Sequence, residues 1–263
     1  MDGDKIRFRF EKIGALRLLS HHDLMRSLER MLRRANLPFK QTLGFHPTPR
    51  VVFALSLPLG VDALNEVVEL ELLTPHSSED VLARLNHQSP EGLRFLSAKV
   101  VPLKATAFAR RAIYRLPLPP GRSDEVAAHA IGLLASEKVW VDRLRPNPRR
   151  VNIRQYIRGI TVTPNAVELD FWVTDSGTAR GDEMIQLLEL SDVIADGAIL
   201  VRADLEIHDE LPPGTPTTGP DTPPTERPET APLEHVPACA GDEEDDATKS
   251  ATWGGTPDGP VVE

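Results

Sequence analysis

Apolar and polar side chains alternate strictly near the start of the chain. Ile6, Phe8 and Phe10 fall on one face of residues 5–10, and three basic side chains fall on the other. Successive side chains of a strand point to opposite faces of its sheet. We therefore predict a half-buried strand here.

The period changes to that of a helix after this strand. Ser20 precedes Asp23 by three residues, and apolar residues recur at intervals of three and four from Leu24 to Met31 before Pro38 interrupts the pattern. A Ser cap with an acid three residues on is typical of a helix start. We predict a helix that begins after Ser20 and ends before Pro38.

The same order of elements is then predicted twice. The first series continues with strands at 50–57 and 67–73, a helix from 77 or 78 to 85 and an extended segment at 94–103. The second series has strands at 112–118, 139–142, around 161, 167–173 and 198–207, with helices at 123–136 and 182–190. Split β-α-β units in this order form an antiparallel sheet with both helices on one face. The predicted fold is α+β, with two tandem ferredoxin-like units at 1–104 and 105–208.

The charge of the chain is unevenly distributed. The formal net charge is −9, yet residues 209–263 contain 13 acidic and 2 basic residues, which leaves 26 acidic and 28 basic residues in 1–208. The segment 209–263 is also rich in Pro and has no periodic apolar face, so we expect it to be disordered. It either keeps the protein soluble or competes with nucleic acid for a basic surface on the body.

Several classes of protein are excluded. The chain lacks an apolar run of the ~18 residues that a membrane helix needs, and its start is charged where a secretory signal is apolar. Its single cysteine, Cys239, excludes an internal disulfide and a Cys-ligated cluster. The common nucleotide-binding, hydrolase and zinc motifs are absent. We expect a cytoplasmic protein with no membrane segment, no metal and no cofactor of its own.

Basic residues gather around the turn at Pro146-Asn147-Pro148. Arg145, Arg149 and Arg150 belong to this cluster, and Asp142 is the one acid close to it in the sequence. Such clusters can contact phosphates, although a solvated surface is also consistent with them. The basic face of the first strand is less informative, because Arg7 and Arg9 could face Glu69 and Glu71 across the sheet.

Two motifs could hold a ligand. The first joins Leu19-Ser-His-His-Asp-Leu-Met-Arg26 to Gly44-Phe-His-Pro-Thr-Pro-Arg50. A helix start presents free N–H groups, so an anion could bind beside Ser20, with His21 and His46 as acid and base. The alternative is that Ser20 and Asp23 only cap the helix. The second motif is Gly177-Thr-Ala-Arg-Gly-Asp-Glu183, where Arg180 could contact an anion or where the loop is simply a tight connection.

These motifs, together with Glu29-Arg-Met-Leu-Arg-Arg34 and Leu57-Pro-Leu-Gly60, resemble the bacterial radical SAM-linked protein family, a domain of unknown function. The resemblance runs from about Lys5 to Ile207. Members are typically encoded beside, or fused to, a radical SAM protein with a cobalamin-binding-like domain. The resemblance implies a radical SAM partner, which would carry S-adenosylmethionine and the iron–sulfur cluster, and an RNA or ribosomal context. The binding residues expected from motifs, basic cluster and resemblance together are Ser20, His21, Asp23, Arg26, Gly44, Phe45, Pro47, Pro49, Arg50, Arg145, Arg149, Arg150, Gly177 and Arg180.

Three functions are consistent with the sequence. The first is an accessory or substrate-presenting partner of a radical SAM enzyme that acts on RNA or the ribosome and has no catalytic activity on its own. The second is a metal-independent RNA-processing enzyme in which His21 is the catalytic residue. The third is a protein–protein scaffold that does not bind nucleic acid.

Overall fold

The computed structural model describes residues 3–43, 45, 47–145, 147–211, 215 and 221–233. The first half contains β1 (Lys5–Lys12), η1 (Gly14–Leu18), α1 (His21–Arg34), β2 (Val51–Phe53), β3 (Asp62–Glu71), α2 (Ser78–Gln88) and β4 (Leu93–Val101). The second half contains β5 (Ala109–Pro117), α3 (Ser123–Ala135), β6 (Trp140–Arg143), β7 (Arg149–Asn152), η2 (Arg154–Tyr156), β8 (Ile157–Thr163), β9 (Ala166–Thr174), β10 (Gly177–Thr178), α4 (Gly181–Leu187), α5 (Ser191–Ala195) and β11 (Val201–Ile207). The 3-10 helix η3 (His208–Glu210) and strand β12 (Thr230–Ala231) follow.

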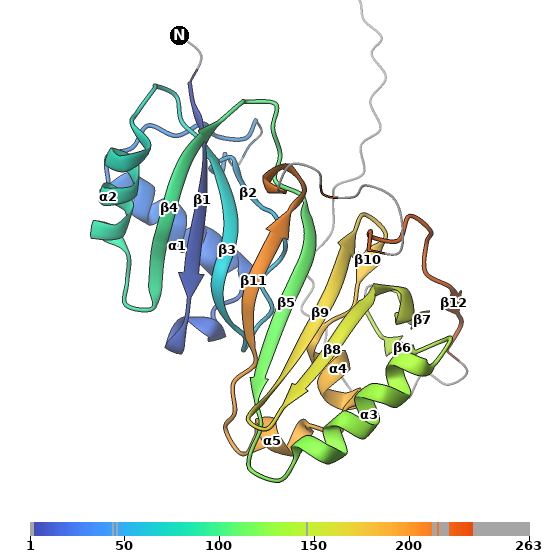
Figure 1. Ribbon diagram of the computed structural model, residues 1–263. Coiled ribbons are helices and arrows are strands. Elements are labelled where there is room, and N and C mark those ends of the chain that lie inside the picture. Colours follow the sequence, from blue (N-terminus) through green and yellow to red (C-terminus); the bar gives the residue numbers. More distant parts are fainter. Residues whose placement is uncertain are drawn as a thin grey trace, which may run out of the picture.

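One nine-stranded sheet runs through both halves (Figure 1). Its order is β10-β9-β5-β11-β3-β1-β4, with β2 also paired to β3 and β8 also paired to β9. The described pairs in this sheet are antiparallel except β11 with β3, where Val201 and Arg202 lie parallel to Asp62 and Ala63. The predicted α+β class is confirmed. The halves share a mixed sheet instead of forming separate antiparallel sheets, because β11 pairs with a strand of each half.

The pairing expected for the polar face of β1 is confirmed for Arg7 and wrong for Arg9, which lies opposite Val67 and not Glu71. Arg7 lies opposite Glu69 in the register of β1 and β3, and its Nη2 is 2.6 Å from Glu69 Oε1. Arg9 instead donates to Glu210 of η3 and to the carbonyl oxygen of Leu205. These arginines therefore fix β1 to the end of the second half and do not form a free basic surface.

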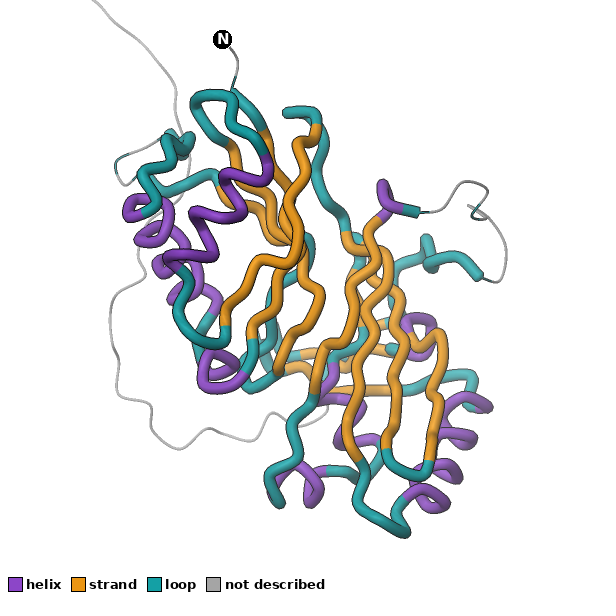
Figure 2. Tube along the Cα trace, turned by 60° about the vertical axis from the view of Figure 1, so that its left-hand side comes forward, coloured by secondary structure: helices purple, strands orange, loops and turns teal. Residues whose placement is uncertain are grey.

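Helices lie beside the sheet in both halves (Figure 2), and the buried apolar side chains form two cores. In the first core, the ring of Phe8 meets that of Phe95 edge-on at 5.3 Å. In the second, the rings of Tyr114 and Phe171 lie 5.5 Å apart. Val67 of β3 belongs to the second core, although its neighbour Val68 belongs to the first. Strand β3 thus contributes to both cores through its two faces.

Two expectations about the second half are corrected. The helix predicted at 182–190 ends earlier, as α4 at Leu187, because Glu189 adopts a left-handed φ of 56°; the short helix α5 that follows was not predicted. The disorder expected throughout 209–263 does not extend to β12, since Thr230 pairs with Val151 and Ala231 with Arg150 of β7. Backbone pairing with β7 holds this short strand in place. The pattern of apolar residues in the sequence therefore does not predict it. Strands β12, β7 and β6 form a separate three-stranded sheet.

Candidate functional site

The start of α1 is capped by its own side chains. Ser20 Oγ accepts a hydrogen bond from the backbone N–H of Asp23 at 3.2 Å and donates one to Asp23 Oδ2 at 2.7 Å. The Asp23 carboxylate therefore already supplies negative charge to the helix start. An anionic ligand would have to displace it. Arg26 lies 3.6 Å from Asp23 and keeps 73% of its side chain exposed.

His21 is held by packing. Its ring lies 5.0 Å from that of Phe53 in β2, edge to face, and its buried Nδ1 has no hydrogen-bond partner among the described residues. Burial lowers the pKa of the His21 ring below its ordinary value of 6.5, and the neighbouring His22 lowers the pKa further. The ring is therefore neutral near pH 7, which suits an aromatic contact.

The structure brings only part of the first motif to this helix start. Gly44 and His46 lie outside the described residues; Phe45 and Pro47 are exposed, and Pro49 is buried and bridges to Gln41. Arg50 turns to β3, where its Nη1 is 3.2 Å from Glu71 Oε2. The motif's contact with α1 is made by Phe53, three residues later, and Arg50 is paired with a structural carboxylate.

The hairpin of β6 and β7 presents the least neutralised basic residues of the predicted site. Arg145 and Arg149 are exposed and form no ion pair with the described residues. Arg150 is less free, because its Nε lies 3.0 Å from Asp142 and its guanidinium lies 5.9 Å from the centre of the Trp140 ring. Cations next to an aromatic ring can contact both the phosphates and the bases of a single strand.

The hairpin is joined to the second motif by Arg143. Its guanidinium binds both carboxylate oxygens of Glu183 at 2.7 and 3.0 Å, and donates to the carbonyl of Thr178 at 2.8 Å. Gly177 precedes this point with a φ of 141°, and Arg180 keeps 52% of its side chain exposed. The structure thus places Arg180 near the arginine hairpin but leaves the two motifs of the sequence in different halves.

Two tryptophans beside this surface were not predicted as functional. Trp140 lies beneath Lys138 at 6.0 Å as well as Arg150, and the guanidinium groups of Arg110 and Arg158 lie 4.8 and 5.4 Å from the centre of the Trp172 ring. We call these the Trp140 cluster and the Trp172 cluster. The sequence gives one indication of the Trp172 cluster: Trp172 lies on the same face of β9 as the charged residues Glu168 and Asp170.

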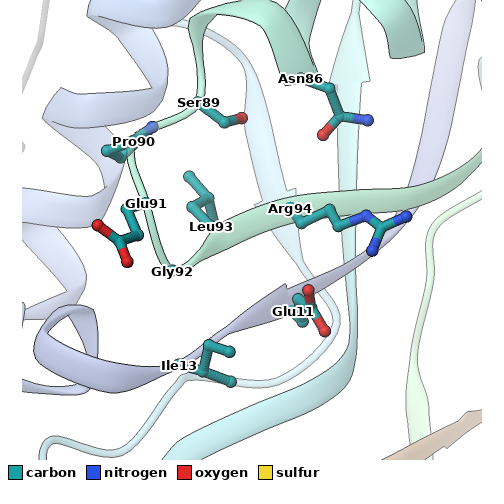
Figure 3. Close-up of a pocket in the computed structure, with 9 residues that line it drawn as sticks. All are labelled: Glu11, Ile13, Asn86, Ser89, Pro90, Glu91, Gly92, Leu93 and Arg94. Atoms are coloured by element: carbon teal, nitrogen blue, oxygen red, sulfur yellow. The ribbon is translucent and has the colours of Figure 1, made fainter.

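The predicted site residues do not line the two pockets described in the structure. A pocket of about 540 Å³ lies where α2 meets β4 (Figure 3). Asn86 in this pocket has a structural role. Its Nδ2 donates to the Phe95 carbonyl at 2.9 Å and its Oδ1 accepts from the Phe95 N–H at 2.8 Å. A second pocket of about 630 Å³ is lined by Arg33, Asn36, Leu37, Pro38, Phe39, Thr74, His76 and Arg84. Within the described ranges, no group of three or more His, Cys, Asp or Glu side chains is placed to hold a metal ion.

Residues 5–183 match the model of a family described as an uncharacterized protein conserved in bacteria, DUF2344. The chain belongs to this family. The match covers the first half, the arginine hairpin and the Gly177 motif, whereas β11, η3 and β12 lie beyond it. No curated protein matches the chain. A crystal structure of an unknown protein from Galdieria sulphuraria is similar at 12% identity with a TM-score of 0.27, covering 79% of this chain and 99% of that one. No helix in the described part of the chain is long and apolar enough to span a membrane.

Proposed function

We propose that this protein binds RNA, or a target that carries RNA, and presents it to a radical SAM enzyme supplied as a separate chain. The observation that carries this proposal is the hairpin of β6 and β7, where Arg145 and Arg149 are exposed without acidic partners among the described residues. A polyanion gains most from cations that the protein has not already neutralised. The partner would hold S-adenosylmethionine and the iron–sulfur cluster, and the complex would act in the cytoplasm.

The accessory role receives more support than catalysis by His21. The ring of a catalytic histidine is normally oriented by a hydrogen bond to its second nitrogen. His21 instead packs on Phe53 with an unpartnered Nδ1, as far as the described residues extend. The histidine therefore contributes to the shape of this surface in our proposal.

We include in the proposal that each half is a ferredoxin-like unit. The strand order is β4-β1-β3-β2 in the first half and β11-β5-β9-β8 in the second half. If the four strands of each half are numbered along the chain, both orders read 4-1-3-2. Both follow the split β-α-β arrangement. In the second half, the β6–β7 hairpin is inserted between α3 and β8, so the arginines lie on an addition to the repeated unit.

RNA binding is tested with a fluorescent single-stranded oligoribonucleotide titrated at several salt concentrations. Replacing Arg145 and Arg149 by Glu should weaken binding and lower the slope of log K against log salt by about 1.4, the value for two lost phosphate contacts on a single strand. The matched control reverses Arg30 and Lys104, which are exposed in the first half. Equal losses in both variants, or binding that does not respond to salt, would contradict the proposal.

The partner is tested by affinity capture from lysate of the source cells, with and without ribonuclease. Recovery of a radical SAM protein together with a discrete RNA supports the accessory role. Recovery of the enzyme alone, unaffected by ribonuclease, favours a scaffold without nucleic acid. One observation favours the scaffold function: Leu18 and Leu59 are 63% and 66% exposed and their segments meet, since the Gly60 N–H donates to the Arg17 carbonyl at 2.8 Å. Replacing Leu59 by Asp would then abolish capture.

A further inference from the structure

An acidic segment of the protein lies on both tryptophan clusters. We call residues 221–233 the strap; it contains three acidic residues and one basic residue. At the Trp172 cluster, Arg158 Nε and Nη2 lie 2.8 and 2.7 Å from Asp221 Oδ1, and Arg110 donates to the Asp221 carbonyl at 3.1 Å. At the Trp140 cluster, Lys138 Nζ is 2.8 Å from Glu229 Oε2. Each acid thus binds a cation that also lies on a tryptophan ring.

The charges of the Trp172 cluster show what Asp221 does. The body alone contributes three arginines, at positions 110, 111 and 158, and two carboxylates that pair with them, Asp170 and Glu206. One positive charge is left, and Asp221 neutralises it. Arg158 offers Asp221 the Nε and Nη2 edge of its guanidinium while its Nη1 binds Asp170 at 2.5 Å. That edge has the geometry that also binds phosphate oxygens.

The Trp140 cluster repeats the arrangement. Lys138 and Arg150 lie 6.0 and 5.9 Å from the centre of its ring, and Asp142 is the carboxylate of the body that pairs with Arg150. The second positive charge, on Lys138, is neutralised by Glu229 of the strap. The strap is also held by its backbone, because the Glu229 carbonyl accepts from the Asn152 N–H at 2.9 Å and β12 pairs with β7.

We infer that the two tryptophan clusters form a binding site for single-stranded RNA and that the strap occupies this site until RNA displaces it. This inference rests on the proposed function and adds to it both the contact surface and its control. Aromatic rings flanked by cations bind single strands by stacking and by phosphate contact. The strap supplies a carboxylate at each cluster, where the phosphate of a bound strand would pair with the cation.

The test uses the full chain and the labelled single strand at low salt. Replacing Asp221 by Asn and Glu229 by Gln should tighten binding about tenfold, since exposed ion pairs of this kind are each worth up to about fivefold. The matched control replaces Asp124 and Asp196 by Asn, which removes the same charge from exposed positions on α3 and after α5. Adding Arg158→Gln should cancel the part of the gain that comes from Asp221→Asn.

A second readout follows the strap itself. On RNA binding to the unmodified chain, the Ala231 amide, which is in the hydrogen-bonded pair with Arg150, should exchange with solvent at least tenfold faster, because β12 leaves β7. The inference is overturned if the unmodified chain binds RNA but the strap variant gains nothing beyond the control, if the gain persists without Arg158, or if the Ala231 amide stays protected. Binding by none of the variants would overturn the proposed function together with it.

Discussion

Glu210 follows β11 in η3 and forms ion pairs with Arg9 of β1 and Lys99 of β4. Removing its charge should destabilise the protein in a pH-dependent way. Its carboxylate accepts from Arg9, lies 2.5 Å from the Lys99 ammonium and lies 3.4 Å from Arg7. Burial alone would raise the pKa of the Glu210 carboxyl, but the hydrogen bonds from Arg9 and Lys99 outweigh it and lower the pKa from 4.5 to about 2. The perturbation to make is Glu210→Gln.

The expected magnitude follows from that pKa. A shift from 4.5 to about 2 corresponds to about 3.4 kcal/mol at 1.36 kcal/mol per unit. The carboxyl is partly solvated, and screening by water reduces the contribution to about 1–2 kcal/mol. Because the folded pKa lies below the unfolded one, this stability is fully present above pH 4.5 and is lost as the pH falls through 2.

The assay is urea unfolding of the two proteins at pH 7, 5, 4 and 3. The variant should unfold with a free energy lower by about 1–2 kcal/mol at pH 7, and the deficit should shrink steadily below pH 4.5. Glu91→Gln, at an exposed position, serves as the control and should change the free energy by less than about 0.5 kcal/mol. A deficit of the same size at pH 7 and pH 3, or none at pH 7, would refute the reasoning.

Three further changes test other parts of the structure. Glu66→Leu should lower the free energy of unfolding by about 3 kcal/mol, because it leaves the buried Arg202 without its carboxylate partner. Adding Arg202→Met should restore most of the lost stability, and a double variant as unstable as the single one would contradict this. NMR titration of His21 should give a pKa below 6.5, and a value at or above 6.5 would show that the ring is solvated. Gly177→Ala should destabilise by about 1–2 kcal/mol because of its positive φ, whereas Gly132→Ala in α3 should stabilise by about 0.5–1 kcal/mol, both measured by urea unfolding.

Local patterns predicted the elements that depend on neighbours in the sequence. The alternation at Ile6, Phe8 and Phe10 fixed the buried face of β1, and the cap at Ser20 fixed the start of α1. The join between the halves depends on the pairing of Val201 with Asp62, which are far apart in the sequence. Periodicity carries no information on such a contact, so the sequence predicted the parts of the sheet but not its continuity.

The candidate site was predictable to a similar degree. Arg145 and Arg149 are exposed, as the turn-bounded cluster of arginines suggested. The contact of Trp172 with both Arg110 and Arg158 assembles from three strands, β5, β8 and β9, so the spacing of these residues does not reveal it. The strap was harder still, because its carboxylates act through contacts with side chains tens of residues earlier in the chain.

The position of β11 between β5 and β3 has a consequence for synthesis on the ribosome. The first half is complete at Val101, but Asp62 and Ala63 have no partner on this edge until Val201 and Arg202 emerge about 100 residues later. At the elongation rate of roughly 5–20 residues per second, that edge stays open for about 5–20 s. The nascent first half would therefore present an unpaired strand edge to other chains during this interval. A ribosome-bound chaperone that covers strand edges would be most useful to this protein between the completion of β4 and the appearance of β11.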